Sequence, residues 1–151
     1  MSDPANDLPR SQFLPDEAAT LTFGGRLARL LAGADGFGGD AIVFLRGELG
    51  AGKTTLVRGI LRALGYAGPV KSPTYTLLEP YEEQAVYHFD LYRIVDSQEL
   101  DFIGIDELMA AKVIKLVEWP DHGLERLPEP NVQVHLSSER QGRRVEISVS
   151  D

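Results

Sequence analysis

The sequence predicts an α/β fold in three layers, with a mixed sheet and an antiparallel hairpin near its C-terminal end. Three observations carry this prediction. A continuous apolar run at residues 41–45 is typical of a strand buried on both faces. Helical patterns stand on either side of that run. Segments 132–136 and 145–149 alternate between apolar and polar residues with a period of two, which indicates a half-exposed hairpin.

The length of 151 residues corresponds to one domain around a single core. We expect residues 1–12, which contain little apolar material, to form a flexible leader, and residues 13–151 to form the domain. Hydrophobic residues make up 43% of the chain and charged residues 25%, as in ordinary globular proteins. These fractions exclude wholesale disorder and a fibrous repeat.

Composition also limits the compartment and the partners. The apolar runs are far shorter than the ~20 residues of a membrane-spanning helix, and the polar, acidic N-terminus lacks a signal-peptide pattern. The chain has no cysteine and therefore no disulfide framework, so we expect a cytoplasmic protein with no membrane contact. The net charge of −8 would repel a polyanion, so any role toward nucleic acid is expected to act through partners or one local basic patch.

The first half of the chain is predicted as helix, strand and helix. A proline and two acids suit the start of a helix over about 15–32, and apolar residues then recur at helical spacing. Within it, Gly24 and Gly25 each cost about 1 kcal/mol relative to alanine. The pair either weakens the helix or lets another group approach its backbone. Strand 41–45 and helix 55–64 follow.

The second half is predicted to be mainly strands. Segment 69–80 is typical of strand and loop, 86–92 and 113–117 of strands, and 96–102 of a short helix that resumes at 105–111. The hairpin strands enclose a charged stretch that contains Gly142. The parallel part of the sheet is therefore expected to precede an antiparallel C-terminal part.

The motif that carries chemistry lies between the buried strand and the second helix. Residues 47–54 match the pattern G-x-x-x-x-G-K-[ST] in full. Its glycines let successive backbone N–H groups point at phosphate oxygens, and the following helix adds its positive end. Lys53 is expected to bridge the β- and γ-phosphates, and the Thr54 hydroxyl to take a place on Mg²⁺. The motif predicts a P-loop NTPase-like fold.

Hydrolysis also needs acids, and two acids end apolar runs, Asp90 and Glu118. Residues at the carboxyl ends of strands beside a P-loop strand face the same crevice, so either acid suits the metal-binding role and spacing alone does not rank them. Residues 72–76 stand where many P-loop proteins sense the γ-phosphate, although a proline turn is the commoner use of such a segment. Trp119 follows Glu118 and is suited either to stacking or to half-buried packing.

Other classes of nucleotide-binding protein are less well supported. No lysine stands in the [NT]-K-x-D motif of GTPases, and no G-x-G-x-x-G opens a Rossmann helix. The histidines show no metal-ligand spacing. A small-molecule kinase remains an alternative, but the chain has little room for both an acceptor pocket and a lid over the phosphates.

Short motifs stand in a characteristic order between residues 15 and 121: Thr20 with Gly24, the segments 47–55, 72–75 and 88–93, Gly104 with Glu107, and 118–120. This set resembles the TsaE (YjeE) family, small bacterial P-loop ATPases required for threonylcarbamoyl modification of the adenosine beside the tRNA anticodon. The resemblance covers most of the chain and is least specific over the C-terminal hairpin.

The resemblance implies a site for ATP and Mg²⁺. Thr20 would lie near the adenine, which gives the glycine-rich helix a reason to approach a ligand. Glu118 would hold Mg²⁺ with Thr54, and Asp90 would be a catalytic or switch acid beside a switch-like segment at 72–75. Trp119 would lie at the site's edge. The implied catalytic set is Asp90, Lys53 and Glu118, and the implied nucleotide-binding set is Thr20, Glu48, Leu49, Gly50, Ala51, Gly52, Lys53, Thr54, Thr55 and Trp119.

The resemblance also implies partners. ATP binding would promote assembly with the TsaB–TsaD heterodimer, which performs the threonylcarbamoyl transfer, while TsaC makes the activated intermediate. Hydrolysis would reset the assembly, and contact with tRNA would be indirect, which suits the acidic chain. A nucleotide-gated adaptor with incidental hydrolysis remains a second hypothesis beside the kinase.

Overall fold

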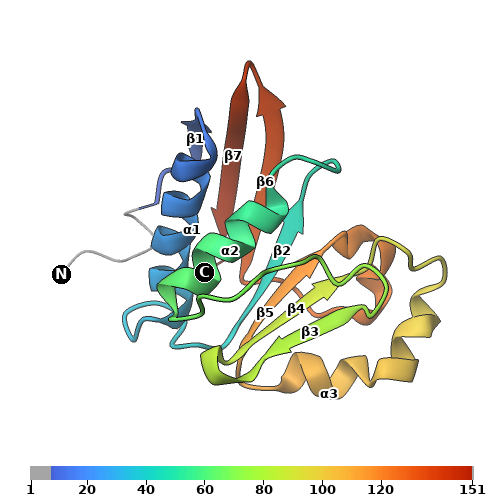
Figure 1. Cartoon of the computed structure of the whole chain (residues 1–151). Coiled ribbons are helices and arrows are strands. Elements are labelled where there is room, and N and C mark those ends of the chain that lie inside the picture. The colour runs from blue at the N-terminus through green and yellow to red at the C-terminus, as the bar shows by residue number, and fades with distance from the viewer. Residues whose placement is uncertain (1–7, 151) are drawn as a thin grey trace.

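The computed structural model describes residues 8–150, in which a mixed sheet forms the middle of three layers (Figure 1). The strand order is β1–β7–β6–β2–β5–β4–β3. Strand β2 pairs in parallel with β5 and β6, and β4 pairs in parallel with β5. The β1–β7, β6–β7 and β3–β4 pairs are antiparallel. The predicted α/β fold with a mixed sheet and an antiparallel C-terminal hairpin is confirmed.

The elements have the following bounds. The strands are β1 (Ser11–Leu14), β2 (Ala41–Arg46), β3 (Leu78–Tyr81), β4 (Val86–Asp90), β5 (Ile114–Glu118), β6 (Val132–Glu139) and β7 (Gly142–Val149). The helices are α1 (Glu17–Ala32), α2 (Lys53–Ala63) and α3 (Ile105–Ala110). Short 3₁₀ segments are η2 (Glu82–Gln84), η3 (Ser97–Ile103), η4 (Pro120–His122) and η5 (Leu124–Arg126).

Ordered structure begins earlier than the sequence pattern indicated. Strand β1 starts at Ser11 and pairs with β7, and the side chain of Leu8 is buried in the core. The expected leader over 1–12 is therefore wrong over its last residues, while residues 1–7 lie outside the described part of the chain. The sequence pattern does not predict this strand, because β1 is short and is stabilised by pairing with β7, a segment more than a hundred residues away.

Two helices, α1 and α2, cover one face of the sheet and approach each other closely. Asp16 caps α1 by accepting a hydrogen bond from the Ala19 amide at 2.8 Å. A Cβ atom at Gly24 would lie 2.7 Å from the Leu56 carbonyl oxygen of α2, and one at Gly59 would lie 2.5 Å from the Leu21 carbonyl oxygen of α1. Gly24 thus lets a second helix approach the backbone of α1, and the approach of this helix to a ligand stays a prediction.

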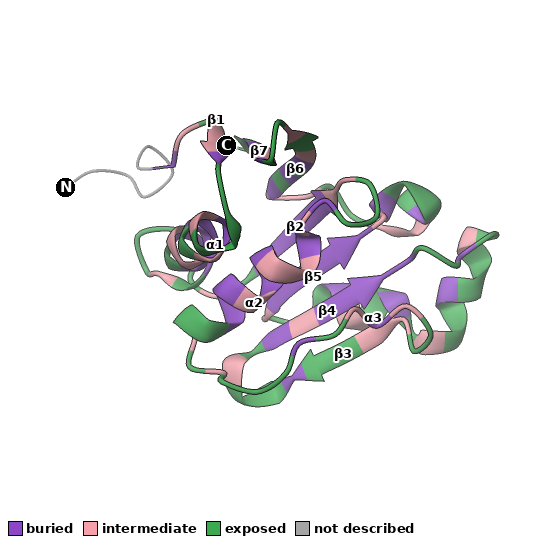
Figure 2. Ribbon diagram, turned by 45° about the horizontal axis from the view of Figure 1, so that its top comes forward, coloured by how far each residue is buried: buried purple, intermediate pink, exposed green. Residues whose placement is uncertain are grey.

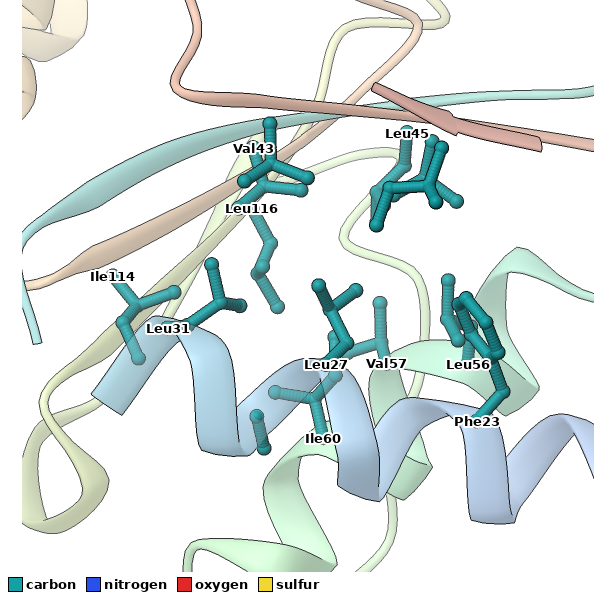
Figure 3. Packing of buried hydrophobic residues seen from close by; sticks show 14 of the residues in the cluster. Phe23, Leu27, Leu31, Val43, Leu45, Leu56, Val57, Ile60, Ile114 and Leu116 are labelled. Carbon is teal, nitrogen blue, oxygen red and sulfur yellow. The ribbon is translucent and has the colours of Figure 1, made fainter. Parts of the chain in front are cut away.

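The two faces of the sheet bury separate hydrophobic clusters. Side chains of α1 and α2 pack against β2 and β5 (Figure 3), as shown by Phe23, Leu27, Leu31, Val43, Leu45, Leu56, Val57, Ile60, Ile114 and Leu116. The opposite face packs against η3 and α3 through Phe44, Phe89, Val117, Leu100, Ile105 and Met109. Strands β2, β5 and β4 are accordingly buried on both faces, whereas the edge strand β3 is largely exposed (Figure 2).

The remaining boundaries differ slightly from the predicted ones. Strand β4 ends at Asp90, because the Asp90 side chain accepts a hydrogen bond from the Tyr92 amide and turns the chain. The helix predicted over 96–102 is the 3₁₀ helix η3. A capping box between Asp96 and Glu99 forms its N-terminus. Within residues 8–150, the helices are all too short or too polar to cross a bilayer.

Candidate functional site

The phosphate loop, residues 47–52, connects β2 to α2 in a conformation that requires glycine. Gly47, Gly50 and Gly52 have φ angles of 154°, 81° and 103°, a region that side chains with a Cβ rarely enter. Gly52 is the N-cap of α2 and provides no side-chain acceptor, so the first amides of the helix keep their hydrogen-bonding capacity for another group. This arrangement suits a phosphate.

Lys53 opens α2 and points back into the loop. Its Nζ donates to the Gly47 carbonyl oxygen at 2.5 Å and lies 3.9 Å from the centre of the Trp119 ring. Burial lowers the pKa of Lys53, while the nearby carboxylates of Glu118, Asp90 and Glu48 act in the opposite direction. The ammonium group is therefore poorly solvated, and a phosphate oxygen would satisfy it better than one carbonyl oxygen does.

The two predicted acids lie side by side. Asp90 ends β4 and Glu118 ends β5, and the two residues are register partners in this parallel pair. Each is only 2% exposed. Because Glu118 is also opposite Leu45 of β2, the sheet brings both acids to the edge where the phosphate loop begins.

Residues of the segment 72–76 connect the acids. The Ser72 hydroxyl donates to Oδ2 of Asp90 at 2.5 Å and lies 3.2 Å from Oε2 of Glu118. Thr74 donates to the same Asp90 oxygen at 3.1 Å. Tyr75 next to it is 80% exposed, and the guanidinium carbon of Arg93 lies 4.1 Å from the centre of its ring. The structure thus places this segment beside the acids, and its role in sensing a phosphate stays a prediction.

His88 forms an acid cluster with Ser72, Asp90 and Glu118. The sequence placed it only within the family motif 88–93, without a role and without metal-ligand spacing. It is fully buried, and its Nε2 lies 2.6 Å from Oε2 of Glu118, where the carboxylate accepts the hydrogen bond. His88 precedes Asp90 by two residues in β4, so both side chains point to the same face of the sheet. The two-residue spacing from Asp90 was the signal in the sequence that could have indicated a role for His88 in the site. It identifies that role only when Glu118 is known to lie opposite Asp90.

These side chains line one cleft of about 370 Å³ at the carboxyl edge of the sheet, formed by Leu49, Gly50, Gly52, Lys53, Thr54, Thr55, Ser72, Thr74, Asp90, Tyr92, Glu118, Trp119 and Arg143. The cleft brings together most of the residues that the sequence predicted for the site. Two of the predicted loop residues, Glu48 and Ala51, do not line it, and the Ala51 side chain is buried in the core.

Thr20 lies in a second, smaller cavity of about 180 Å³ beside this cleft. Its side chain is buried and lies 3.4 Å from the Asp16 carbonyl oxygen. The two cavities share Gly52, Thr55 and Arg143 in their walls. Thr20 is thus adjacent to the phosphate cleft, and its contact with adenine stays a prediction.

The cleft has the oxygen donors that a magnesium ion requires. Thr54 and Glu118 both line it. Oε2 of Glu118 takes the contacts with His88 and Ser72, which leaves Oε1 without a hydrogen bond among the described residues. A hydroxyl and a carboxylate oxygen fit the partial protein coordination that Mg²⁺ accepts when phosphates and water supply the rest.

Trp119 borders the cleft in a left-handed conformation, with a φ angle of 56°. Its ring centre lies 5.0 Å from that of Tyr92 and 5.6 Å from that of His122. Two residues later, Asp121 accepts hydrogen bonds from Nε and Nη2 of Arg46, each at 3.0 Å. Arg46 ends β2, so this ion pair ties the start of the phosphate loop to the chain that follows Glu118.

Comparison with known proteins agrees with this geometry. The sequence profile of the family described as "Threonylcarbamoyl adenosine biosynthesis protein TsaE" matches residues 14–145. A Haemophilus influenzae protein named "tRNA threonylcarbamoyladenosine biosynthesis protein TsaE" is 42% identical over 139 residues, which cover 91% of this chain and 87% of that protein. A Synechocystis protein of the same name is 39% identical over 78% of this chain and 71% of its own length. The crystal structure of Bacillus subtilis YdiB superposes with a TM-score of 0.73 at 25% identity, over 93% of this chain and 85% of that one.

Proposed function

Because the chain belongs to the TsaE family of tRNA threonylcarbamoyladenosine biosynthesis proteins, we propose that it binds ATP with Mg²⁺ and hydrolyses it in support of that modification. One observation carries the proposal. A buried lysine of the phosphate loop shares a cleft with two buried acids from the ends of neighbouring strands. Burial of three charged groups is costly unless a ligand uses them. The phosphates of a nucleoside triphosphate would pair with the lysine, and its divalent cation would pair with the acids.

The loop residues would bind the phosphates. Amides of residues 50–55 would donate to the phosphate oxygens, and Lys53 would exchange the Gly47 carbonyl oxygen for the β- and γ-phosphates. Thr54 and Glu118 would hold Mg²⁺, which neutralises charge on the phosphates when bound. His88 would keep the Glu118 carboxylate oriented by occupying one of its oxygens.

Asp90 would act on the attacking water. Its carboxylate accepts hydrogen bonds from Ser72, Thr74 and the Tyr92 amide, so its position is determined by the backbone and by the segment 72–76. From there it would orient a water molecule in line with the terminal phosphate and accept its proton. The chain would therefore supply the water-positioning group itself.

The proposed partners are TsaB and TsaD as a heterodimer, with a functional link to TsaC and an indirect link to tRNA, in the cytoplasm. Leu49, which lines the cleft, is 67% exposed, and Tyr75, which follows the cleft residue Thr74 in the chain, is 80% exposed. Exposed large apolar side chains of this kind favour a partner protein over a charged nucleic acid. The net charge of −8 supports the same choice.

Phosphate release by the purified chain with ATP and Mg²⁺ tests the reaction. We expect Glu118→Gln to lower the rate at least about a hundredfold, because the ligand oxygen loses its charge, and Glu129→Gln, an exposed acid away from the cleft, to leave it unchanged. Equal rates in both variants would refute the role of Glu118. Transfer of phosphate to a small acceptor instead of water would favour the kinase alternative.

Modification of tRNA by the reconstituted system separates a motor from an adaptor. With TsaB, TsaC and TsaD present, we expect repeated turnovers of tRNA modification to require ATP hydrolysis by this chain. With the Glu118→Gln variant, modification should stop after the first turnovers. Sustained modification with a nonhydrolysable ATP analogue would show that the chain acts as a nucleotide-gated adaptor.

A further inference from the structure

The C-terminal hairpin places a second cation beside the phosphate loop. Figure 1 shows β6 and β7 extending beyond the carboxyl end of β2, where the loop begins. Arg143, near the start of β7, lies next to this loop: its Nη2 donates to the Gly50 carbonyl oxygen at 2.9 Å. A Cβ atom at Gly52 would lie 3.4 Å from its Nε. The loop and Arg143 are thus in contact although some 90 residues separate them.

Arg143 and its neighbour Arg144 differ in their partners. Arg144 forms an ion pair with Glu139 at 2.6 Å and points to the other face of the hairpin. Arg143 donates only to the neutral carbonyl oxygens of Gly50 and Gly142, and no carboxylate pairs with it in the described part of the chain. Its positive charge is therefore available to an anion in the cleft, and a guanidinium fork binds phosphate oxygens well.

The position of Arg143 determines which phosphate of a bound nucleotide it would contact. Arg143 lines both the phosphate cleft and the Thr20 cavity, and Gly52 and Thr55 form the rest of the shared wall. Lys53 lies on the cleft side of that wall. If the base of a nucleotide occupies the Thr20 cavity and its terminal phosphates lie at Lys53, its ribose and the phosphate next to the ribose lie against this shared wall.

We propose that Arg143 is a nucleotide-contacting residue, which binds the phosphate nearest the ribose where a nucleoside triphosphate passes from one cavity to the other. The inference rests on the proposed function, because it takes ATP as the ligand of both cavities. It assigns the hairpin a role in the site: β7 closes the nucleotide site from the side opposite the acids.

Calorimetric titration of the full chain with MgATP and with magnesium pyrophosphate tests this proposal. Pyrophosphate reaches the Lys53 position but has no ribose-proximal phosphate. We expect Arg143→Gln to weaken ATP binding roughly ten- to a hundredfold, since a charge-assisted hydrogen bond is lost. Pyrophosphate binding should change by less than about threefold. Arg143→Lys, which keeps the charge without the fork, should fall between wild type and Arg143→Gln.

Arg144→Gln is the matched control and should bind ATP as the wild type does. Unchanged ATP affinity in Arg143→Gln, in a variant whose melting temperature is normal, would overturn the proposal. Equal weakening of ATP and pyrophosphate would also overturn it, because Arg143 would then act only by shaping the loop through Gly50. A wild-type chain that binds pyrophosphate but not ATP would instead refute the proposed function.

Discussion

The phosphate loop and the acid cluster meet at one cleft but are built differently. The acid cluster consists of Ser72, Asp90 and Glu118, which line the cleft, and of His88, which is buried behind Glu118. The main contact of the loop, from Lys53 to the Gly47 carbonyl oxygen, joins residues six positions apart. Contacts in the acid cluster join residues 18, 30 and 46 positions apart. The loop is therefore local in sequence, whereas the acid cluster depends on the register of β4 against β5.

This difference has a consequence for stability. The loop offers backbone groups to a ligand, so its variants should lose binding while the fold persists. The acid cluster is buried and internally hydrogen-bonded, so some of its variants should destabilise the fold as well. Four predictions test this contrast, in order of decreasing effect.

Replacement of Lys53 by methionine should weaken ATP binding more than a hundredfold, because a poorly solvated cation is lost from the phosphates. The same variant should melt slightly higher at pH 7. Burial lowers the pKa of Lys53 below its ordinary value of 10.5, so the folded chain binds this proton less tightly than the unfolded chain does. The ionised group therefore lowers stability at neutral pH, and this penalty fades as the pH rises through the folded-state pKa toward 10.5.

Titration calorimetry and thermal unfolding between pH 7 and pH 10 measure both effects, with the exposed Lys112→Met as control. Wild-type affinity in Lys53→Met would contradict the site, and a melting temperature well below that of the wild type would contradict the contrast between the two regions.

Replacement of Asp90 by asparagine should lower phosphate release by about a hundredfold, the loss expected when a group that positions and deprotonates water is removed. ATP affinity should stay within about threefold, since the loop and Lys53 are unchanged. Steady-state hydrolysis and calorimetry measure the two quantities, and Asp106→Asn, an exposed acid on α3, is the control. Loss of affinity without loss of rate would show that Asp90 serves binding instead.

Replacement of His88 by alanine should lower the free energy of unfolding by about 2–4 kcal/mol, because a cavity forms and the buried Glu118 loses a donor. His135, exposed on β6, provides the control, and His135→Ala should change stability by less than about 0.5 kcal/mol. Denaturant titration measures both. A His88→Ala chain as stable as the wild type would mean that the acid cluster contributes nothing to the fold.

The ion pair between Arg46 and Asp121, which links the two regions, should have the smallest effect. A double-mutant cycle with Arg46→Met and Asp121→Asn should give a coupling of about 0.5–1 kcal/mol at pH 7, as for other exposed pairs. The hydrogen bond from Arg46 lowers the pKa of Asp121, so this stabilisation is present above the ordinary range of an aspartate and is lost as the pH falls through the folded-state pKa. Thermal unfolding at pH 7 and at a pH well below the ordinary pKa of an aspartate checks it, and a coupling of the same size at both pH values would contradict it.

Much of the fold was predictable because its signals are local. The apolar run that forms β2, the motif that precedes α2 and the alternation in β6 and β7 each determine structure within a short window. Strand β1 was not predictable in the same way, since its four residues depend on pairing with β7. The pair Gly24 and Gly25 left open whether the helix is weakened or another group approaches its backbone, and the structure shows that α2 approaches Gly24, which no local pattern identifies.

For the site, the sequence by itself determined the conformation of the loop 47–52 and the places of Lys53 and Thr54 after it, because contiguous residues of this motif dictate its backbone. It also presented Asp90 and Glu118 as strand-end acids without ranking them from spacing. Only the tertiary structure decided that these acids adjoin each other, that His88 holds Glu118, and that Arg143 reaches Gly50 from the hairpin. The physical reason is that strand register and helix packing bring distant residues together, and a buried polar group then takes whichever partner lies within hydrogen-bonding distance.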